Sequence, residues 1–363
     1  MAIDLRAVAK KLRKSALVRG LRKEAPAVGS RARGLITALL PPPITSRPPP
    51  FEPRTPKADS GPDGEPPAGL AAHLGQIVHK RLGQLVATID FAEQDDQVEA
   101  LHDLRVASRR LRAFVMLFEP LLDPPIVTHV GKPLRRVTRA AGELRDLDVQ
   151  SKLIEERVAA QSTDAARAAL EHLLERVHAR RDAVQADARK KLRKVRPSDV
   201  SVGVAAALGE VVARIPVSSA EAAKVAWTLL EPLVDDMEAR DHAVGHDAPP
   251  DALHHLRISI KKLRYALELV APLLGDAQRE LIKRAESLQE LLGTHHDLVV
   301  ISGLMDDEQK KLEENGRKTL PFGLTVLRGE LFAEERSLVS RFEATRAAPG
   351  YFRDRIQTAL ANA

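Results

Sequence analysis

Apolar residues recur at intervals of three and four along most of this chain, a pattern that predicts long amphipathic helices. From about residue 68 to residue 347 the pattern is interrupted only by short stretches that contain Pro, Gly or Asp. The predicted helices fall into two series of five. The first series covers 68–93, 97–119, 126–145, 147–160 and 164–194, and the second covers 219–243, 250–272, 276–292, 296–314 and 318–346.

The two series are separated by three residues that break or loosen helices, namely Pro197, Gly203 and Pro216. We therefore predict one folded body with a first half over 68–196 and a second half over 217–347. Residues 348–363 are expected to form a C-terminal tail or a short helix.

The N-terminal residues 1–67 have a different composition and are predicted to be mostly disordered. Eleven of the 24 prolines lie in 41–67, which favours an extended linker. Residues 1–40 carry ten Lys or Arg against two acidic residues. This stretch is either a short basic amphipathic helix or a basic tail, and non-specific contact with DNA or a membrane surface is open to it.

The overall composition predicts an all-α protein. Helix-forming residues dominate, aromatic residues reach 3%, and the 44% hydrophobic content is enough for a sizeable core. There is no cysteine, which fits a reducing compartment and a cytoplasmic location. No stretch is apolar and long enough to predict a transmembrane segment, and the N-terminus does not resemble a secretory signal.

The positive charge of the chain is unevenly distributed. The whole chain has a formal net charge of +6, and residues 1–40 alone carry +8, which leaves −2 for the other 323 residues. A basic binding surface on the folded body must therefore be segregated from the acidic residues.

A sequence motif occurs once in each half. LHDLRVASRRLR at 101–112 matches LHHLRISIKKLR at 253–264, at an offset of 152 residues. Downstream, GELRDLDV at 142–149 matches GTHHDLVV at 293–300, at an offset of 151 residues. The two halves are therefore interpreted as a tandem repeat of antiparallel helical bundles.

Each copy of the first motif places two stripes on one helix. The apolar stripe, which should face the core, consists of Leu101, Leu104, Ser108, Leu111 and Val115, and in the second copy of Leu253, Leu256, Ile260, Leu263 and Leu267. The second stripe is rotated by about 100° and runs about 15 Å along the helix. Its members are His102, Arg105, Arg109 and Arg112, and in the second copy His254, Arg257, Lys261 and Arg264.

Like charges in register along a helix repel one another, so a fold alone gains nothing from such a stripe. One interpretation is a solvated face whose charges pair with acidic residues of neighbouring helices. The other is a site for an anion with many phosphates, because each charged contact to a phosphate stabilises by about 1.5–3 kcal/mol. The duplication of the stripe favours the second interpretation.

Further basic residues accompany the stripes, and the first half has more of them. Glu286 and Glu290 fall at positions that correspond to Arg135 and Arg139. The first half is therefore expected to contribute more charge to a site. The additional candidates are Arg110 and Lys262 within the motif, Arg135, Arg136, Arg139 and Arg145 in the first half, and Lys283, Arg284 and His296 in the second half.

The H-x-L-R motif followed by R-R-L-R or K-K-L-R, together with G-E-L-R-D-L-D and its copy G-T-H-H-D-L, resembles the CHAD family, the conserved histidine α-helical domain. The resemblance covers about 68–347. It implies two helical bundles related by pseudo-twofold symmetry, whose histidine-bearing helices face a basic channel or groove. The chain departs from the family pattern at His295 and His296, where the first half has Leu144 and Arg145.

The resemblance also implies a function, namely binding of inorganic polyphosphate and association with polyphosphate granules, without a cofactor. His102 and His254 would donate hydrogen bonds and gain charge on binding, so binding is expected to be tighter near pH 6 than near pH 8. The predicted binding residues are His102, Arg105, Arg109, Arg110, Arg112, Arg135, Arg136, Arg139, Arg145, His254, Arg257, Lys261, Lys262, Arg264, Lys283, Arg284 and His296.

Other functions remain as alternatives. A general polyanion or nucleic-acid-binding protein would also use a basic groove, although Trp227, Tyr265 and Tyr351 are the only Trp or Tyr residues available for base stacking. Clustered histidines leave open a metal site, and a phosphohydrolase-associated domain is a further alternative. An enzyme is not predicted, because the sequence has no phosphate-binding glycine loop and no paired nucleophile and base. Asp146 and Asp297 are expected to cap or brace a helix junction by pairing with nearby basic groups.

Overall fold

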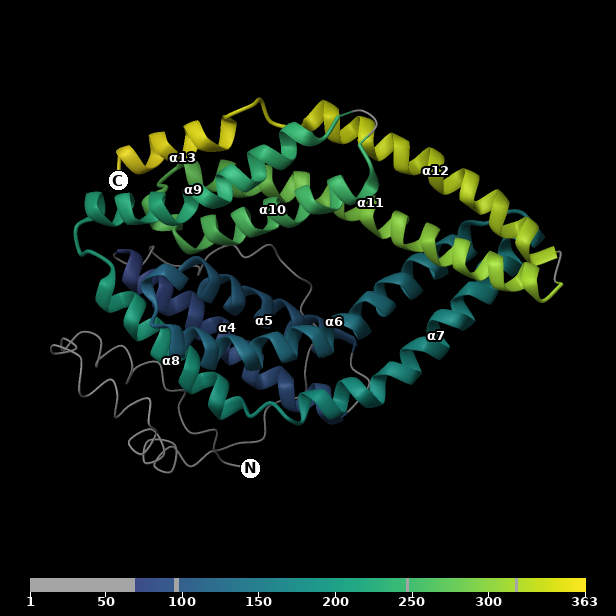
Figure 1. The fold of residues 1–363 in the computed structure, drawn as a ribbon, viewed down its shortest axis with the longest axis horizontal. Coiled ribbons are helices and arrows are strands. Elements are labelled where there is room, and N and C mark those ends of the chain that lie inside the picture. The colour runs from purple at the N-terminus through teal and green to yellow at the C-terminus, as the bar shows by residue number, and fades with distance from the viewer. Residues whose placement is uncertain (1–68, 95–97, 246–247, 317–318) are drawn as a thin grey trace.

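The computed structural model describes residues 69–94, 98–245, 248–316 and 319–363, and within them every regular element is a helix (Figure 1). The all-α fold class is therefore confirmed. The predictions for residues 1–67 lie outside the described residues. No helix in the described ranges is both long and apolar enough to cross a membrane.

The same order of elements occurs twice along the chain. Two helices are followed by a single 3₁₀ turn, a very long helix and another long helix. The pseudo-twofold relation between the two halves remains a prediction. In the first half the elements are α4 (Leu70–Gln94), α5 (Val98–Leu117), η1 (Glu119–Leu121), α6 (Pro124–Ala160) and α7 (Asp164–Leu192), and in the second half α9 (Ser219–Ala243), α10 (Pro250–Leu269), η2 (Ala271–Leu273), α11 (Ala277–Glu314) and α12 (Thr319–Thr345).

Two predicted helix breaks were wrong, because α6 and α11 are continuous. The sequence predicted ends near residues 145 and 292, next to the repeated Gly and Asp residues. Leu144 and Leu147 are both buried, so the segment between them packs on both sides of the expected break. Tertiary packing therefore outweighs the low helix propensity of Gly and Asp at these positions.

The predicted joint between the halves contains a helix that the sequence did not predict, α8 (Pro197–Arg214). Pro197 occupies the first turn, where its missing N–H costs nothing and its fixed φ favours a helix. A Cβ on Gly203 would lie 3.2 Å from Val130 Cβ, so this glycine allows close packing of α8 on α6. The buried stripe of α8 consists of Val200, Val204, Ala207, Leu208 and Val211.

The C-terminal residues form a helix, α13 (Tyr351–Ala361), which packs on α9 and α11. It starts after Gly350, whose φ of 77° lies in the left-handed region that favours glycine. Phe352, Ile356 and Leu360 repeat every four residues and are buried. These contacts hold the end of the chain against the second half.

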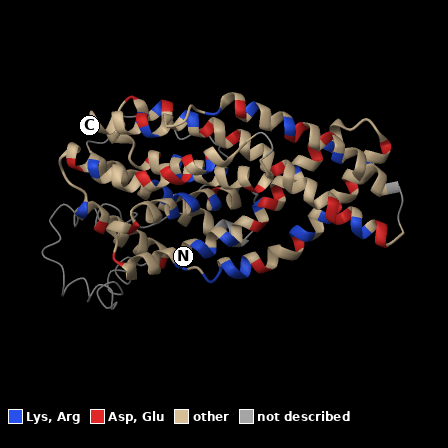
Figure 2. Cartoon of the chain, turned by 45° about the horizontal axis from the view of Figure 1, so that its top comes forward, with Lys and Arg blue, Asp and Glu red and all other residues tan. Residues whose placement is uncertain are grey.

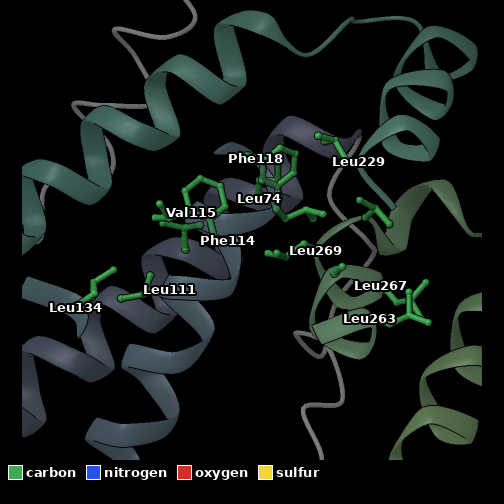
Figure 3. Packing of buried hydrophobic residues seen from close by; sticks show 14 of the residues in the cluster. Leu74, Leu111, Phe114, Val115, Phe118, Leu134, Leu229, Leu263, Leu267 and Leu269 are labelled. Atoms are coloured by element: carbon green, nitrogen blue, oxygen red, sulfur yellow. The ribbon is translucent and has the colours of Figure 1, made fainter. Parts of the chain in front are cut away.

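The larger of two hydrophobic cores, which we call the main core, joins the two halves. In the close view, Leu74 and Phe118 from the first half lie in one cluster with Leu229 and Leu269 from the second half (Figure 3). The apolar stripes predicted for the two motif helices belong to this core, since every member is buried. The two halves therefore pack together as one body.

A second, smaller core, the distal core, lies where the ends of the long helices α6, α7, α11 and α12 meet, on the right in Figure 1. On α6 the main core ends at Leu144 and the distal core begins at Leu147. On α11 the change occurs between Leu292 and Leu298. The repeated segments 142–149 and 293–300 therefore lie at the boundary between the cores.

Candidate functional site

The two motif helices, α5 and α10, pack against each other. Their apolar stripes enter the main core, as predicted, and their basic stripes are partly buried beside the contact between the helices. Lys and Arg are interleaved with Asp and Glu over most of the molecule (Figure 2). The position of the site therefore depends on which basic residues the packing of the helices brings together. The overall charge of the molecule does not identify it.

Four cationic residues meet where α5 and α10 face each other, namely Arg105, Arg109, Arg257 and Lys261, which we call the central cluster. Burial, and then the positive charges of neighbouring arginines, lowers the pKa of Lys261 to about 7. Burial and the charge of Arg105 likewise lower the pKa of Arg109. The fold thus holds these positive charges together at an energetic cost.

Few carboxylates balance the central cluster. Arg105 pairs with Asp146 across 2.9 Å between Nη1 and Oδ1. Among the described residues, no ion pair joins Arg109, Arg257 or Lys261 to a carboxylate. The Nε atom of Arg257 is buried and has no hydrogen-bond partner. The cluster therefore has an excess of positive charge that an anion could neutralise.

The repeated glycines explain how the arginines fit. Arg105 donates a hydrogen bond to the carbonyl of Gly142, and a Cβ on Gly142 would lie 3.4 Å from its guanidinium. A Cβ on Gly293 would lie 3.5 Å from Nε of Arg257. The glycine of each copy thus leaves room for the motif arginine of the same half. This packing accounts for the nearly equal spacing between the two motifs, whose offsets of 152 and 151 residues differ by one.

The repeated aspartates do not occupy a helix junction, since α6 and α11 run through these positions. Asp146 braces Arg105, so the predicted pairing with a basic group is confirmed for this residue. Burial raises the pKa of Asp297, against the opposing effect of the nearby Arg257 charge. Both carboxyl groups therefore lie at the central cluster, one in each half.

The histidines of the second half form a pair. The Nδ1 atoms of His254 and His296 are 3.0 Å apart. Burial, and then the proximity of His254, lowers the pKa of His296 to about 4, and burial also lowers the pKa of His254. Both imidazoles are thus neutral near pH 7. In the first half, His102 lies partly buried on α5.

Besides Arg105, two further predicted binding residues are paired with acidic residues of the protein. Arg110 pairs with Glu268 across 3.1 Å. Arg264 pairs with Glu286 across 2.7 Å and lies 3.7 Å from Glu268. Both guanidinium groups also lie over the ring of Tyr265, at 5.6 and 4.9 Å from its centroid. The Arg110 contacts link α5 to α10, the Arg264–Glu286 pair links α10 to α11, and both leave less positive charge for a ligand.

A solvent-open pocket of about 770 Å³ adjoins the central cluster between α5, α6, α7 and α11. Sequence reasoning missed Arg180 in its wall, because this residue belongs to no repeated motif. It also missed the polar residues Thr138 and Gln150. The charged lining residues are Arg105, Arg109, Arg112, Arg139, Arg180, Glu143, Asp146 and Asp307.

The remaining candidates lie at different distances from the site. The charges of Arg135 and Arg139 lower the pKa of Arg112, and the charge of Arg145 opposes the raised pKa of Asp297. Arg135, Arg139 and Arg145 therefore lie near the site. Arg136 reaches the carbonyl of Lys194 at 3.4 Å. Arg284 lies beside Tyr351 at the base of α13, away from the cluster. Lys262 and Lys283 are exposed.

No group of three or more potential metal ligands occurs among the residues that the structure describes. The His254 and His296 pair is instead surrounded by the positive charges of Arg257 and Lys261, which would repel a cation.

The fold and site together define an all-α chain with a duplicated basic helix motif. The family model described as "CHAD domain" matches residues 76–306, and the chain belongs to the CHAD family. The chain is also similar to the crystal structure of the CHAD domain from the plant Ricinus communis, with a TM-score of 0.56 and 23% identity over 80% of this chain and 92% of that chain. This similarity supports the fold. No curated protein matches the chain.

Proposed function

We propose that this chain is a binding protein for inorganic polyphosphate and that it acts at polyphosphate granules in the cytoplasm. The observation that carries the proposal is the central cluster, in which four cationic residues converge and Lys261 is held with its pKa near 7. A bound chain of phosphates would attract the four cationic side chains that now repel one another. Its binding would also release the counterions that surround the free polyphosphate. Membership of the CHAD family, whose members are associated with polyphosphate, supports the same ligand.

A competition assay on the full chain tests the proposal. Labelled long-chain polyphosphate is bound at about 150 mM salt, because lower salt would exaggerate non-specific attraction. We expect unlabelled polyphosphate to displace the label, and single-stranded and duplex DNA to displace it poorly at equal phosphate concentration. Displacement by DNA that equals displacement by polyphosphate would instead make the chain a general polyanion-binding protein.

Binding of polyphosphate is expected to be about tenfold tighter at pH 6 than at pH 8. The free Lys261 has a pKa of about 7, and a bound polyanion raises this pKa, so binding takes up a proton that is already present at pH 6 and is missing at pH 8. His254 and His296 are not assigned this role, because their pKa values are lowered. Affinity measured by titration calorimetry at both pH values provides the test.

Two substitutions separate these assignments. Lys261→Arg keeps a positive charge over the whole pH range and should flatten the dependence, whereas Lys262→Arg is the matched control on the exposed neighbour and should preserve it. A dependence that survives Lys261→Arg and disappears in the variant with both His254→Gln and His296→Gln would transfer the role to the histidines.

A further inference from the structure

Beyond the central cluster, positive charge continues along α5 and α6 of the first half. Arg112 lies seven residues after Arg105 on α5, a rise of about 10 Å along the helix axis. It lines the same pocket as Arg105 and Arg109. Burial, and then the charges of Arg135 and Arg139, lowers the pKa of Arg112. Three guanidinium groups from α5 and α6 are therefore close to one another beside the central cluster.

These three arginines, which we call the side patch, have no ion pair with a carboxylate among the described residues. Arg135 and Arg139 are exposed and one helical turn apart, so they lie on one face of α6. The side chain of Arg135 lies against Gly131, where a Cβ would be 3.3 Å from Nη1. The side patch is thus an accessible group of positive charges without a structural counter-ion.

The corresponding region of the second half is closed to an anion. The repeat offsets place Arg264 at the position of Arg112 and Glu286 at the position of Arg135. In the first half Arg112 is repelled by Arg135 and Arg139. In the second half Arg264 instead pairs with Glu286 across 2.7 Å and lies 3.7 Å from Glu268. Glu290 stands at the position of Arg139. A phosphate chain that continued this way would meet carboxylates.

We propose that a polyphosphate chain bound at the central cluster continues over the first half alone, where Arg112, Arg135 and Arg139 bind its further phosphates. This inference rests on the proposed function and adds a direction and a length requirement to it. A short oligophosphate occupies the central cluster, and only a longer chain also reaches the side patch. The planar guanidinium groups suit successive phosphates, because each offers paired donors to phosphate oxygens.

The experiment compares two ligands, tripolyphosphate and long-chain polyphosphate, by titration calorimetry on the full chain. In the variant with Arg112→Ala, Arg135→Ala and Arg139→Ala, affinity for the long chain should fall at least about tenfold, which corresponds to loss of one charged contact. Affinity for tripolyphosphate should stay within about twofold. Because Arg112 is partly buried, a second variant with only the exposed Arg135→Gln and Arg139→Gln is expected to show a smaller loss of the same kind.

The matched control removes the same charge from exposed residues of the second half that are not binding candidates, through Lys224→Ala, Arg279→Ala and Arg341→Ala, and should leave both affinities within about threefold. Equal weakening by both triple variants would overturn the inference, because it would indicate a general charge effect. The inference would also be overturned if the side-patch variant lost affinity equally for tripolyphosphate and for long-chain polyphosphate. If the unmodified chain bound neither ligand, the proposed function itself would fail, a result distinct from these.

Discussion

Replacing Arg105, Arg109, Arg257 and Lys261 together by alanine is expected to lower the affinity for long-chain polyphosphate by at least about 10³-fold. Each charged contact with a phosphate stabilises a complex by about 1.5–3 kcal/mol, so the loss of several leaves little specific binding. The measurement is a binding isotherm for the full chain at about 150 mM salt. An affinity that changed by less than tenfold would place the binding site elsewhere.

The same variant should be about as stable as the unmodified protein, because the removal of mutual repulsion offsets the loss of the Arg105–Asp146 pair. The lowered pKa values of Lys261 and Arg109 indicate that the folded protein opposes their charged forms. Functional sites commonly carry such a cost in stability. Urea unfolding of both proteins therefore distinguishes a lost ligand contact from a lost fold.

A matched variant controls for net charge. It replaces four exposed basic residues that are not binding candidates by alanine, namely Lys190, Lys224, Arg279 and Arg341. Its net charge equals that of the central-cluster variant, and its affinity should remain within a few-fold of the unmodified chain. A comparable loss in both variants would show that the central cluster acts only through the overall charge of the protein.

The motif helices could be predicted from the sequence because their signal is local. Residues three and four apart share a helix face whatever the rest of the chain does. The apolar stripes that include Leu104 and Leu256 are therefore buried, as predicted. The repeat offsets also placed Gly142 and Gly293 at equivalent positions. What periodicity could not provide was the partner of each basic residue.

Those partners lie far apart in sequence. Glu268 lies 158 positions beyond Arg110, and no pattern on either helix identifies the pair. The contact between His254 and His296 depends in the same way on how α10 packs against α11. For this reason the sequence could indicate a set of cationic residues without separating those that face a ligand from those that stabilise the fold.

The errors in helix boundaries have a related cause. Pro197 and Gly203 were interpreted as breaks, whereas in the structure the proline begins α8 and the glycine lies in its contact with α6. Gly and Pro have weak effects compared with the burial of a full apolar stripe. Their meaning therefore depends on neighbours that the local sequence does not reveal.

A Gly323→Ala substitution in α12 is expected to destabilise the protein by about 2 kcal/mol. A Cβ at this position would lie 2.2 Å from the carbonyl oxygen of Ala165 and 2.9 Å from the Cβ of Ala169, so α7 and α12 would have to separate. These helices pack together through the distal core, which holds the ends of the two halves in contact. Urea unfolding measures the change in free energy.

The matched control is Gly329→Ala, six residues further along α12, where a Cβ meets nothing within 4 Å. Alanine there should stabilise the helix by up to about 1 kcal/mol, since it is the better helix former. Hydrogen exchange should show that Gly323→Ala loosens the distal ends of α7 and α12 before the main core. If both alanine variants were equally stable, α7 and α12 would not be in close contact.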